Sequence, residues 1–298
     1  MSKKIVAMLM AVAMAFSLLP VTAFAEGENA PVEPTTIYVS TTGTEGAAGT
    51  ESNPFQTIQD AVSYIEAEQQ KSESTDATWI ISVAEGTYSR FLVPHGVKNI
   101  TIQGSGDTTV INTLDGSLLS VDESSVHNSD GQGIIVWGAN ITLKNLKIIS
   151  GTYKKNKWYA SAVGTHDDMG GSGTEVSTPV ILDHCTFVGQ GTGYAFMPQR
   201  EAFTVQNCSF DNYEQAINSA CDNYSANDCK VIHNTIKNCT YAIHGYYGKN
   251  QAAAAMEIAN NTISGQPNRF AVIAVLDQNL TGAVKLNIHD NTFSYTIV

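Results

Sequence analysis

Charged side chains that could act on a ligand recur a few residues after short apolar segments in the second half of the sequence. The carboxylates are Asp168, Glu201, Asp222 and Asp277, and the basic residues beside them are His166, Arg200, His244 and Lys249. If the apolar segments stack in register, these side chains converge in one lane on the surface. The alternative is that they are solvated loop residues of an acidic protein.

Such a lane would allow several kinds of chemistry, and the catalytic candidates are Asp168, Glu201, Asp222, Arg200 and His166. Two of the carboxylates could serve as acid and base for cleavage of a glycosidic bond. Arg200, or a lysine, could remove a proton in β-elimination from a uronate if its pKa is lowered. Asp168 and Asp222 could also bind Ca²⁺ through their oxygens, and Ca²⁺ is the only cofactor that these residues suggest.

The insertion at 150–173 predicts a second kind of contact with a ligand, because it places aromatic residues among lysines. Aromatic rings stack on the apolar C–H faces of sugars, and lysines can pair with the carboxylates of an acidic glycan. The carbohydrate-binding candidates are Trp158, Lys155 and Lys157, with Tyr246, Tyr247 and Lys249 further along the same face. The alternative is that Trp158 and Tyr159 are core residues, since Tyr194 and Tyr241 occupy the equivalent strand.

The elements that must position these residues form a repeat. One large apolar residue anchors each unit: Ile148, Phe187, Phe210, Ile236, Ile263 and Phe293, at intervals of 39, 23, 26, 27 and 30 residues. Apolar and polar residues alternate before each anchor, as in a strand with one buried face. A period of this length, built from short strands and Gly/Asn turns, predicts a solenoid whose coils stack like residues on like. A β-sandwich is the alternative, but only Asp115-Gly116 and Asp130-Gly131 are hairpin-turn dipeptides, and both lie outside the clear repeats.

Two further features of the repeat concern its bends and its end. Three residues before each anchor stands Asn, His or Asp, from Asn145 to Asp290, and we expect stacked asparagines at this bend to pass hydrogen bonds between coils. Upstream, Ile58, Ala61, Val62 and Ile65 recur at helical spacing after Pro54. This pattern predicts an amphipathic helix that caps the open apolar end of the stack.

Several segments also resemble a known superfamily. They read TTIYVSTTGTEG, NPFQTIQDAVSYI, IISVAEGTY, NITIQG and GANITLKNLKI, and they are similar to the right-handed parallel β-helix superfamily of pectate lyases and pectinesterases. The resemblance implies an all-β, right-handed parallel β-helix domain at 37–298. It also implies that ligands lie across one sheet face beside loops at the strand ends. Members include lyases, hydrolases, esterases and non-catalytic surface proteins.

The function expected from these residues is binding of an extracellular polysaccharide, with or without catalysis. Pectate lyases use arginine and calcium-binding aspartates, whereas this chain has only Arg90, Arg200 and Arg269 and lacks an Asp-rich motif of that kind. We therefore expect a secreted or cell-surface binding protein. The alternative is a polysaccharide lyase or glycoside hydrolase acting on an acidic, pectin-like glycan.

The N-terminal segment predicts export. A basic start, an apolar run and the small-x-small sequence Ala23-Phe24-Ala25 are typical of a signal peptide at 1–25, followed by a linker at 26–36. An uncleaved anchor is the alternative. Without Lys3 and Lys4, 14 basic residues face 28 acidic ones, a net charge near −14, which argues against a nucleic-acid partner. We expect no membrane span after cleavage, and a chain that continues beyond Val298 in a longer protein.

The cysteines follow the repeat. Cys185 and Cys208 occupy the same place in adjacent units, so we expect stacked free thiols, with a strained bridge as the alternative. Cys221 and Cys229 bracket a short loop that they could clip. The spacing of the five cysteines does not suggest a zinc site.

Overall fold

The structure is a computed structural model that describes residues 33–71, 77–113, 132–151, 161–165, 179–198, 202–221, 229–247, 253–265, 273–277 and 283–295. At a few strand ends it describes the backbone alone. The chain divides into two compact units, Met1–Glu33 and Pro34–Val298, and the described strands belong to the second. The predicted signal peptide at 1–25 lies outside the described residues.

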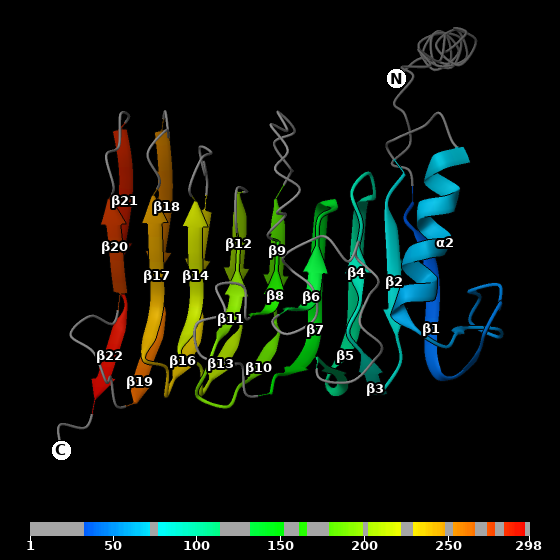
Figure 1. Cartoon of the computed structure of the whole chain (residues 1–298), viewed down its shortest axis with the longest axis horizontal. Helices are drawn as coiled ribbons and strands as arrows, with labels where there is room; N and C mark the ends of the chain where they lie inside the picture. The colour runs from blue at the N-terminus through cyan, green and yellow to red at the C-terminus, as the bar shows by residue number, and fades with distance from the viewer. Residues whose placement is uncertain are drawn as a thin grey trace, which may run out of the picture. The chain divides into compact units, whose positions relative to one another are not determined.

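Parallel strands account for most of the described residues of the second unit (Figure 1). They are β1 (Thr35–Thr44), β2 (Trp79–Val83), β3 (Gly86–Ser89), β4 (Leu92–Val93), β5 (Lys98–Asn112), β6 (Gln132–Val136), β7 (Ala139–Ile149), β8 (Ser161–Gly164), β9 (Val180–Asp183), β10 (Thr186–Val188), β11 (Tyr194–Met197), β12 (Phe203–Gln206), β13 (Ser209–Asp211), β14 (Gln215–Cys221), β15 (Cys229–Ile232), β16 (Thr235–Lys237), β17 (Tyr241–Tyr247), β18 (Ala253–Ala259), β19 (Thr262–Gly265), β20 (Ile273–Asp277), β21 (Ala283–His289) and β22 (Thr292–Tyr295). The one helix among the described residues is α2 (Ile58–Lys71).

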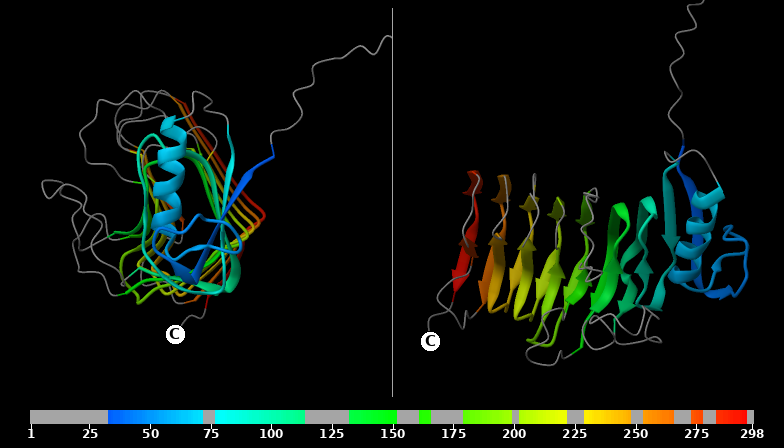
Figure 2. Two further views of the ribbon diagram at one scale, coloured as in Figure 1. Left: turned by 90° about the vertical axis from the view of Figure 1, so that its right-hand side faces the viewer. Right: turned by 45° about the horizontal axis from the view of Figure 1, so that its top comes forward.

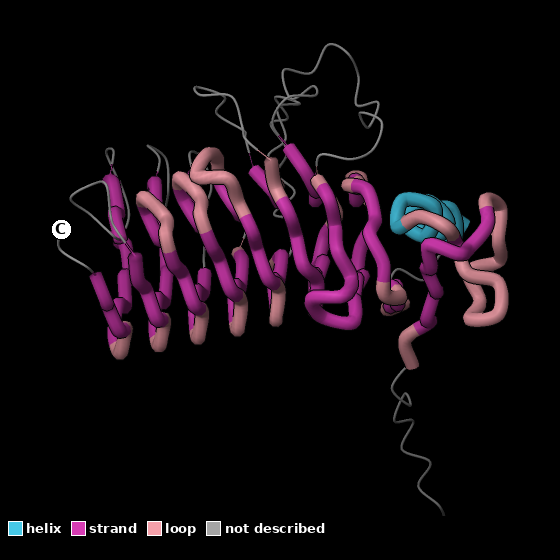
Figure 3. The backbone as a smooth tube through the Cα atoms, turned by 90° about the horizontal axis from the view of Figure 1, so that it is seen from below, coloured by secondary structure: helices cyan, strands magenta, loops and turns pink. Residues whose placement is uncertain are grey.

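From β9 to β20, each coil adds one strand to each of three rows. Among the described residues, a 15-stranded sheet contains the rows β7-β9-β12-β15-β18-β21 and β7-β10-β13-β16-β19-β22, which share β7. A separate 7-stranded sheet has the order β4-β6-β8-β11-β14-β17-β20. Viewed along the stack, strands of successive coils superimpose (Figure 2), and the tube drawing shows the same bend repeated coil after coil (Figure 3). The predicted parallel solenoid is confirmed.

The anchor residues form a continuous row inside the stack. Ile148 pairs with Phe187, Phe187 with Phe210 and Phe210 with Ile236, each in register. The rings of Phe187 and Phe210 stack at 4.7 Å between centroids and 14° between planes. All four side chains are fully buried. The row therefore supplies the apolar contact that a single coil could not bury alone.

The bend between the two rows of the larger sheet is set by a left-handed residue. Its φ lies between 51° and 58° at Asn145, His184, Asn207, His233, Asn260 and Asp290. Asparagine, aspartate and histidine adopt this conformation more readily than other non-glycine residues. The sequence position predicted as the bend is therefore correct.

The hydrogen-bond ladder is not at the bend residue, as we expected, but at the next one. Bend residues such as Asn207 and Asn260 are exposed, because the left-handed conformation turns the following residue inward in their place. That following residue is buried in the first five of these coils, where Leu146, Cys185, Cys208, Asn234 and Asn261 are each 1–2% exposed, and it is half-buried at Asn291 in the last one. We call this inward series, continued by Asn291, the ladder row.

Amide groups link the second half of the ladder row. Oδ1 of Asn261 accepts from the backbone N–H of Asn234 at 2.9 Å and from its Nδ2 at 3.0 Å. Nδ2 of Asn261 donates to the carbonyl of Val231 at 2.8 Å and to Oδ1 of Asn291 at 2.9 Å. The backbone N–H of Cys208 donates in the same way to Oδ1 of Asn234. One asparagine therefore connects three coils.

In the two coils before Asn234, the ladder row is occupied by cysteine side chains. Cys185 and Cys208 are free, buried thiols, as predicted. The N–H of Cys185 points at Sγ of Cys208 at 3.4 Å, and that thiol donates to the carbonyl of Gln206 at 3.1 Å. Burial raises the pKa of Cys208 well above its usual value and that of Cys239 to about 12. Both stay protonated thiols. Cys229 is a free, buried thiol beside Met256 of the next coil, so the expected clip between Cys221 and Cys229 is wrong.

The predicted capping helix is α2. Its buried face is formed by Ile58, Ala61, Val62 and Ile65, as the helical spacing predicted. Thr57 caps the first turn, since its Oγ1 accepts from the N–H of Asp60 at 3.1 Å.

Two glutamines of α2 also bind the edge of the first coil. Gln59 accepts from the N–H of Leu92 at 2.8 Å and donates to its carbonyl at 3.2 Å. Gln69 does the same for Lys98, at 3.1 and 2.7 Å. Each side-chain amide thus takes the place of a peptide group in a neighbouring strand.

Candidate functional site

The loops that carry the predicted catalytic residues all leave the same edge of the 7-stranded sheet. Val163 of β8 pairs with Phe196 of β11, and Phe196 pairs with Ile217 of β14. Asp168, Glu201 and Asp222 each follow one of these residues by five positions (168 − 163, 201 − 196 and 222 − 217). The three loops therefore begin at equivalent positions in three successive coils.

The side chains of those loops are not among the described residues. Asp168, His166, Arg200, Glu201 and Asp222 all lie outside them. The paired-carboxylate lane and the calcium site at Asp168 and Asp222 therefore stay predictions. Within the described part of the chain, histidine, cysteine, aspartate and glutamate do not gather in a group of three that could hold a metal ion.

The predicted carbohydrate-binding residues are placed only in part. Trp158, Lys155, Lys157 and Lys249 lie outside the described residues. The backbone of Tyr246 and Tyr247 forms the end of β17, in register with Leu276 and Asp277 of β20. Their side chains are not described, so their role stays a prediction.

The outer face of the 7-stranded sheet carries a cluster of polar and aromatic residues that reading the sequence missed as a site. We call Tyr194, Gln215, Asn218, Tyr241 and His244 the outer cluster, from β11, β14 and β17. Tyr194, Tyr241 and His244 are half-buried, and Gln215 and Asn218 are 7% and 9% exposed. His244 had been named only as a neighbour of the lane.

A local break in alternation places these residues on the outside. In β11, Ala195 and Phe196 are consecutive, fully buried members of the core, and Ala195 has no partner in the β-ladder. Two consecutive core residues occur in the same way at Ala216-Ile217 and Ala242-Ile243. The residue before each pair, and Asn218 and His244 after the second and third pairs, therefore face outward. Tyr194 and Tyr241, whose strand position we had used as the core reference for Tyr159, are outer-face residues.

The outer cluster is internally connected. Nδ1 of His244 lies 3.0 Å from Oε1 of Gln215 in the preceding coil. The ring of Tyr241 stacks on the imidazole at 5.6 Å between centroids and 19° between planes. Asn218 forms a hydrogen bond with Tyr194. These contacts fix polar groups of three successive coils on one surface.

The outer cluster is electrically neutral near pH 7. Burial lowers the pKa of His244, so its imidazole is uncharged at neutral pH. Burial, and then the charge of Glu214, raise the pKa of Tyr194, which stays a phenol. Hydroxyl, amide and neutral imidazole groups beside aromatic rings are suited to binding sugar hydroxyls and C–H faces.

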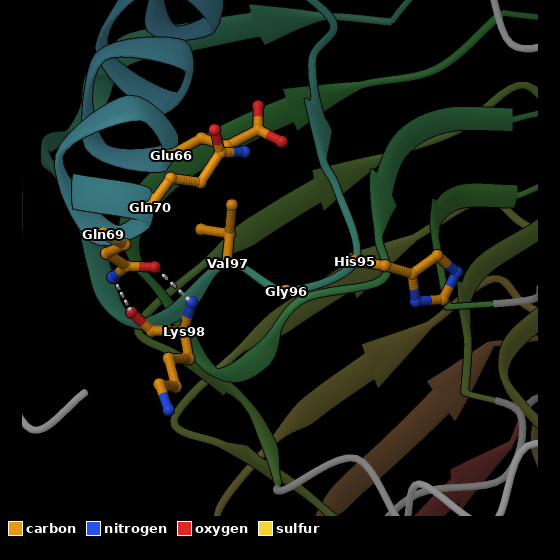
Figure 4. A pocket seen from close by; sticks show the side chains of 7 residues that line it. All are labelled: Glu66, Gln69, Gln70, His95, Gly96, Val97 and Lys98. Atoms are coloured by element: carbon orange, nitrogen blue, oxygen red, sulfur yellow. Dashed lines mark hydrogen bonds between the residues drawn. The ribbon is translucent and has the colours of Figure 1, made fainter. Parts of the chain in front are cut away.

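A small pocket lies at the other end of the stack, between α2 and the turn after β4 (Figure 4). It has a volume of about 160 Å³ and is lined by Glu66, Gln69, Gln70, His95, Gly96, Val97 and Lys98. The amide of Gln69 is already bound to the backbone of Lys98. Because ligand pockets usually enclose about 300–1,000 Å³, this one is a weaker candidate than the outer face.

Comparison with known families agrees with the fold. Residues 95–263 match the family described as right handed beta helix region, and the chain belongs to that family. This match confirms the predicted superfamily. No curated protein sequence matches the chain.

Solved structures are similar at low identity. A pectin methylesterase from carrot shares 15% identity over 89% of this chain and 84% of its own, with a TM-score of 0.46. A pectin methylesterase from Aspergillus niger shares 17% over 89% and 86%, with a TM-score of 0.48. A rhamnogalacturonan lyase shares 11% over 86% and 87%, with a TM-score of 0.36. Likeness at this level concerns the fold alone. Within the described residues, α2 is too short and too polar to span a membrane.

Proposed function

We propose that this chain is an exported protein that binds extracellular polysaccharide across the outer face of its 7-stranded sheet, without cleaving it. The observation that carries the proposal is the outer cluster, where two tyrosines, two amides and an imidazole share one surface across three coils. An extended polymer matches such a surface because equivalent positions recur at every coil, about 4.8 Å apart.

The predicted loop residues would extend this surface. Trp158, Lys155 and Lys157 precede β8, whereas Tyr246, Tyr247 and Lys249 lie at or beyond the end of β17, so these residues would add rings and cations at the two opposite ends of the parallel strands. The ligand would then be a surface or matrix glycan outside the cell, consistent with the signal-like segment at 1–25.

The second candidate function is a polysaccharide lyase or glycoside hydrolase. It is favoured by the sequence spacing of Asp168, Glu201 and Asp222. Each lies five residues after a member of the in-register row Val163, Phe196 and Ile217. A hydrolase would need two of these carboxyl groups about 5–10 Å apart. A calcium-dependent lyase would need Asp168 and Asp222 to bind one ion.

Affinity electrophoresis through gels containing pectin, alginate, a glycosaminoglycan or xyloglucan tests binding. Pectin is included because the names of two structural neighbours contain it. We expect at least one polymer to retard the protein, and Tyr241→Ala to weaken binding about tenfold through loss of a stacking ring. The matched control is Lys230→Ala, an exposed residue of β15 in the other sheet. Equal retardation of both variants would contradict the proposed face.

Catalysis is tested on the same polymers by absorbance of unsaturated products and by reducing ends, with and without Ca²⁺. We expect no turnover. Turnover abolished by Asp168→Asn, Glu201→Gln or Asp222→Asn, with binding retained, would replace the binding function by the enzymatic one.

A further inference from the structure

The contact between Gln215 and His244 crosses between two coils of the outer cluster. Gln215 stands opposite Tyr241 in the β14–β17 ladder, and His244 stands opposite Asn218. The amide of Gln215 therefore reaches diagonally to the imidazole, with Oε1 3.0 Å from Nδ1. Tyr241 covers one face of the same ring. The imidazole is thus held at one edge and on one face by different strands.

This contact decides which ring nitrogen carries the proton. An amide oxygen has lone pairs and no hydrogen, so it can only accept. Nδ1 of His244 must then be the donor. A neutral imidazole has a single N–H, which leaves the lone pair on Nε2. The side chain of Gln215 is 7% exposed, so water competes little for its oxygen.

We propose that Gln215 is a positioning residue, which holds His244 with Nε2 as the hydrogen-bond acceptor for a hydroxyl group of the bound polysaccharide. This inference rests on the proposed function and adds a chemical requirement to it. The ligand must offer a hydroxyl donor at this position, and the site must stay uncharged to accept it.

Binding is then pH-sensitive, with a definite sign. The imidazolium form has an N–H on both nitrogens and loses the acceptor, so affinity is full above the pKa of His244 and falls as the pH drops through it. Burial places that pKa below the ordinary value of about 6.5. Among the described residues, the neighbours of the ring are Tyr241 on its own strand and Gln215 on β14, with Asn218 of β14 and Ala274 of β20 in register with His244; of these, Tyr241 is the titratable one.

The positioning role can be tested without any glycan. Long-range ¹H–¹⁵N spectra of the imidazoles, assigned with His244→Gln, should show a protonated Nδ1 and an unprotonated Nε2 for His244. Gln215→Met keeps the length of the side chain but removes the acceptor, so the preference should weaken. Gln215→Glu should raise the pKa of His244 by placing a carboxylate at Nδ1. A protonated Nε2 in the unsubstituted protein would overturn the inference.

The ligand role is tested by isothermal titration calorimetry with xyloglucan and with polygalacturonate, at about pH 7.5 and at a pH below the pKa that the spectra give for His244. Xyloglucan is neutral, so a change with pH in its binding cannot come from the polymer. We expect binding to weaken about 3- to 10-fold at the lower pH, the effect of one hydrogen bond. His244→Ala should bind with the weaker affinity at both pH values, and Gln215→Glu should lose affinity at a higher pH than the unsubstituted protein.

The failures can be told apart. If His244→Ala binds as well as the unsubstituted protein at both pH values, the inference is wrong and the proposed function stands. If neither polymer binds the unsubstituted protein, the proposed binding of these polymers and the proposed ligand role of His244 are both wrong. In that case the tautomer seen in the spectra still decides the positioning role of Gln215.

Discussion

The two halves of the ladder row fill the same inward position of the coil with different side chains. Cys185 and Cys208 fill it in two coils, while Asn234, Asn261 and Asn291 fill it in the next three. A thiol is a weak donor and a weak acceptor, so the sulfur half depends mainly on packing. An amide has an acceptor and two donors, and Asn261 uses all of them inside the core. The amide half is therefore more specific and less tolerant of substitution.

The largest effect is expected for Asn261→Leu. Leucine fits the ladder row, as Leu146 shows, but it leaves the N–H and Nδ2 of Asn234 and the carbonyl of Val231 without their partner. Each buried polar group left unsatisfied costs about 1–3 kcal/mol, so the free energy of unfolding should fall by about 3–5 kcal/mol.

Urea denaturation followed by circular dichroism measures this loss, with Thr262→Ala as the matched control. Thr262 is the next residue and is exposed, so its change should stay within about 0.5 kcal/mol. If Asn261→Leu costs no more than a substitution in the sulfur half, the amide ladder is not what distinguishes the two halves.

The outer side of the same bend extends the comparison to charge. Asp183 accepts from Nδ1 of His184 at 2.7 Å and from Nδ2 of Asn207 at 3.1 Å, with Nζ of Lys144 at 3.5 Å. Burial opposes ionisation of Asp183, but the hydrogen bonds from Asn207 and His184 outweigh it, so its pKa is lowered. Hydrogen bonds to charged groups contribute about 1.5–3 kcal/mol, and Asp183→Asn should cost about that much at neutral pH.

The pH dependence follows from that lowered pKa. The unfolded chain binds the proton more tightly, so the contribution of Asp183 is complete above its ordinary pKa of about 3.9 and is lost as the pH falls through the folded value. The gap in unfolding midpoint between Asp183→Asn and the unsubstituted protein should therefore close in acid. His289 occupies the same register row at the other end of the stack, but its side chain is 38% exposed, so His289→Gln should shift the midpoint less than Asp183→Asn does. A gap that persists in acid would show that packing, not charge, explains Asp183.

The smallest effect is expected in the sulfur half. Cys208→Ala removes one buried sulfur and its weak contact with the N–H of Cys185, a loss of about 1 kcal/mol. In the unsubstituted protein, reaction of Cys185, Cys208 and Cys239 with a thiol reagent should wait for unfolding, since all three are buried. Rapid labelling of these residues under native conditions would contradict the buried, protonated state.

The period of the repeat was enough to predict the solenoid, because in-register stacking requires like residues to recur, as the row of Ile148, Phe187 and Phe210 does. The sequence could not tell which of two adjacent polar residues faces the core. Asn260 and Asn261 have the same side chain, and only the left-handed backbone of Asn260 turns Asn261 inward. The ladder was therefore placed one residue too early.

The candidate site was harder to predict for a similar reason. Strict alternation would place the residues two positions apart in Tyr194-Ala195-Phe196 on one face, whereas the double inward step leaves the tyrosine outside. Gln215 also meets His244 through a diagonal contact between coils, and a single strand carries no signal of it. The positions of the loop candidates from Asp168 to Asp222 depend on the path of each loop, which the period of the repeat does not specify.

The two glutamines of α2 bear on the order in which the chain can fold. Gln59 and Gln69 bind backbone groups only 33 and 29 residues further along the sequence. During synthesis this closure needs only the first third of the chain, long before β21 exists. Because the backbone groups of Leu92 and Lys98 at one edge of the first coil are already hydrogen-bonded to α2, later segments pair with the opposite edge. The helix thus gives a repetitive sequence a defined starting register, which reduces the chance that one coil pairs with the wrong copy of itself.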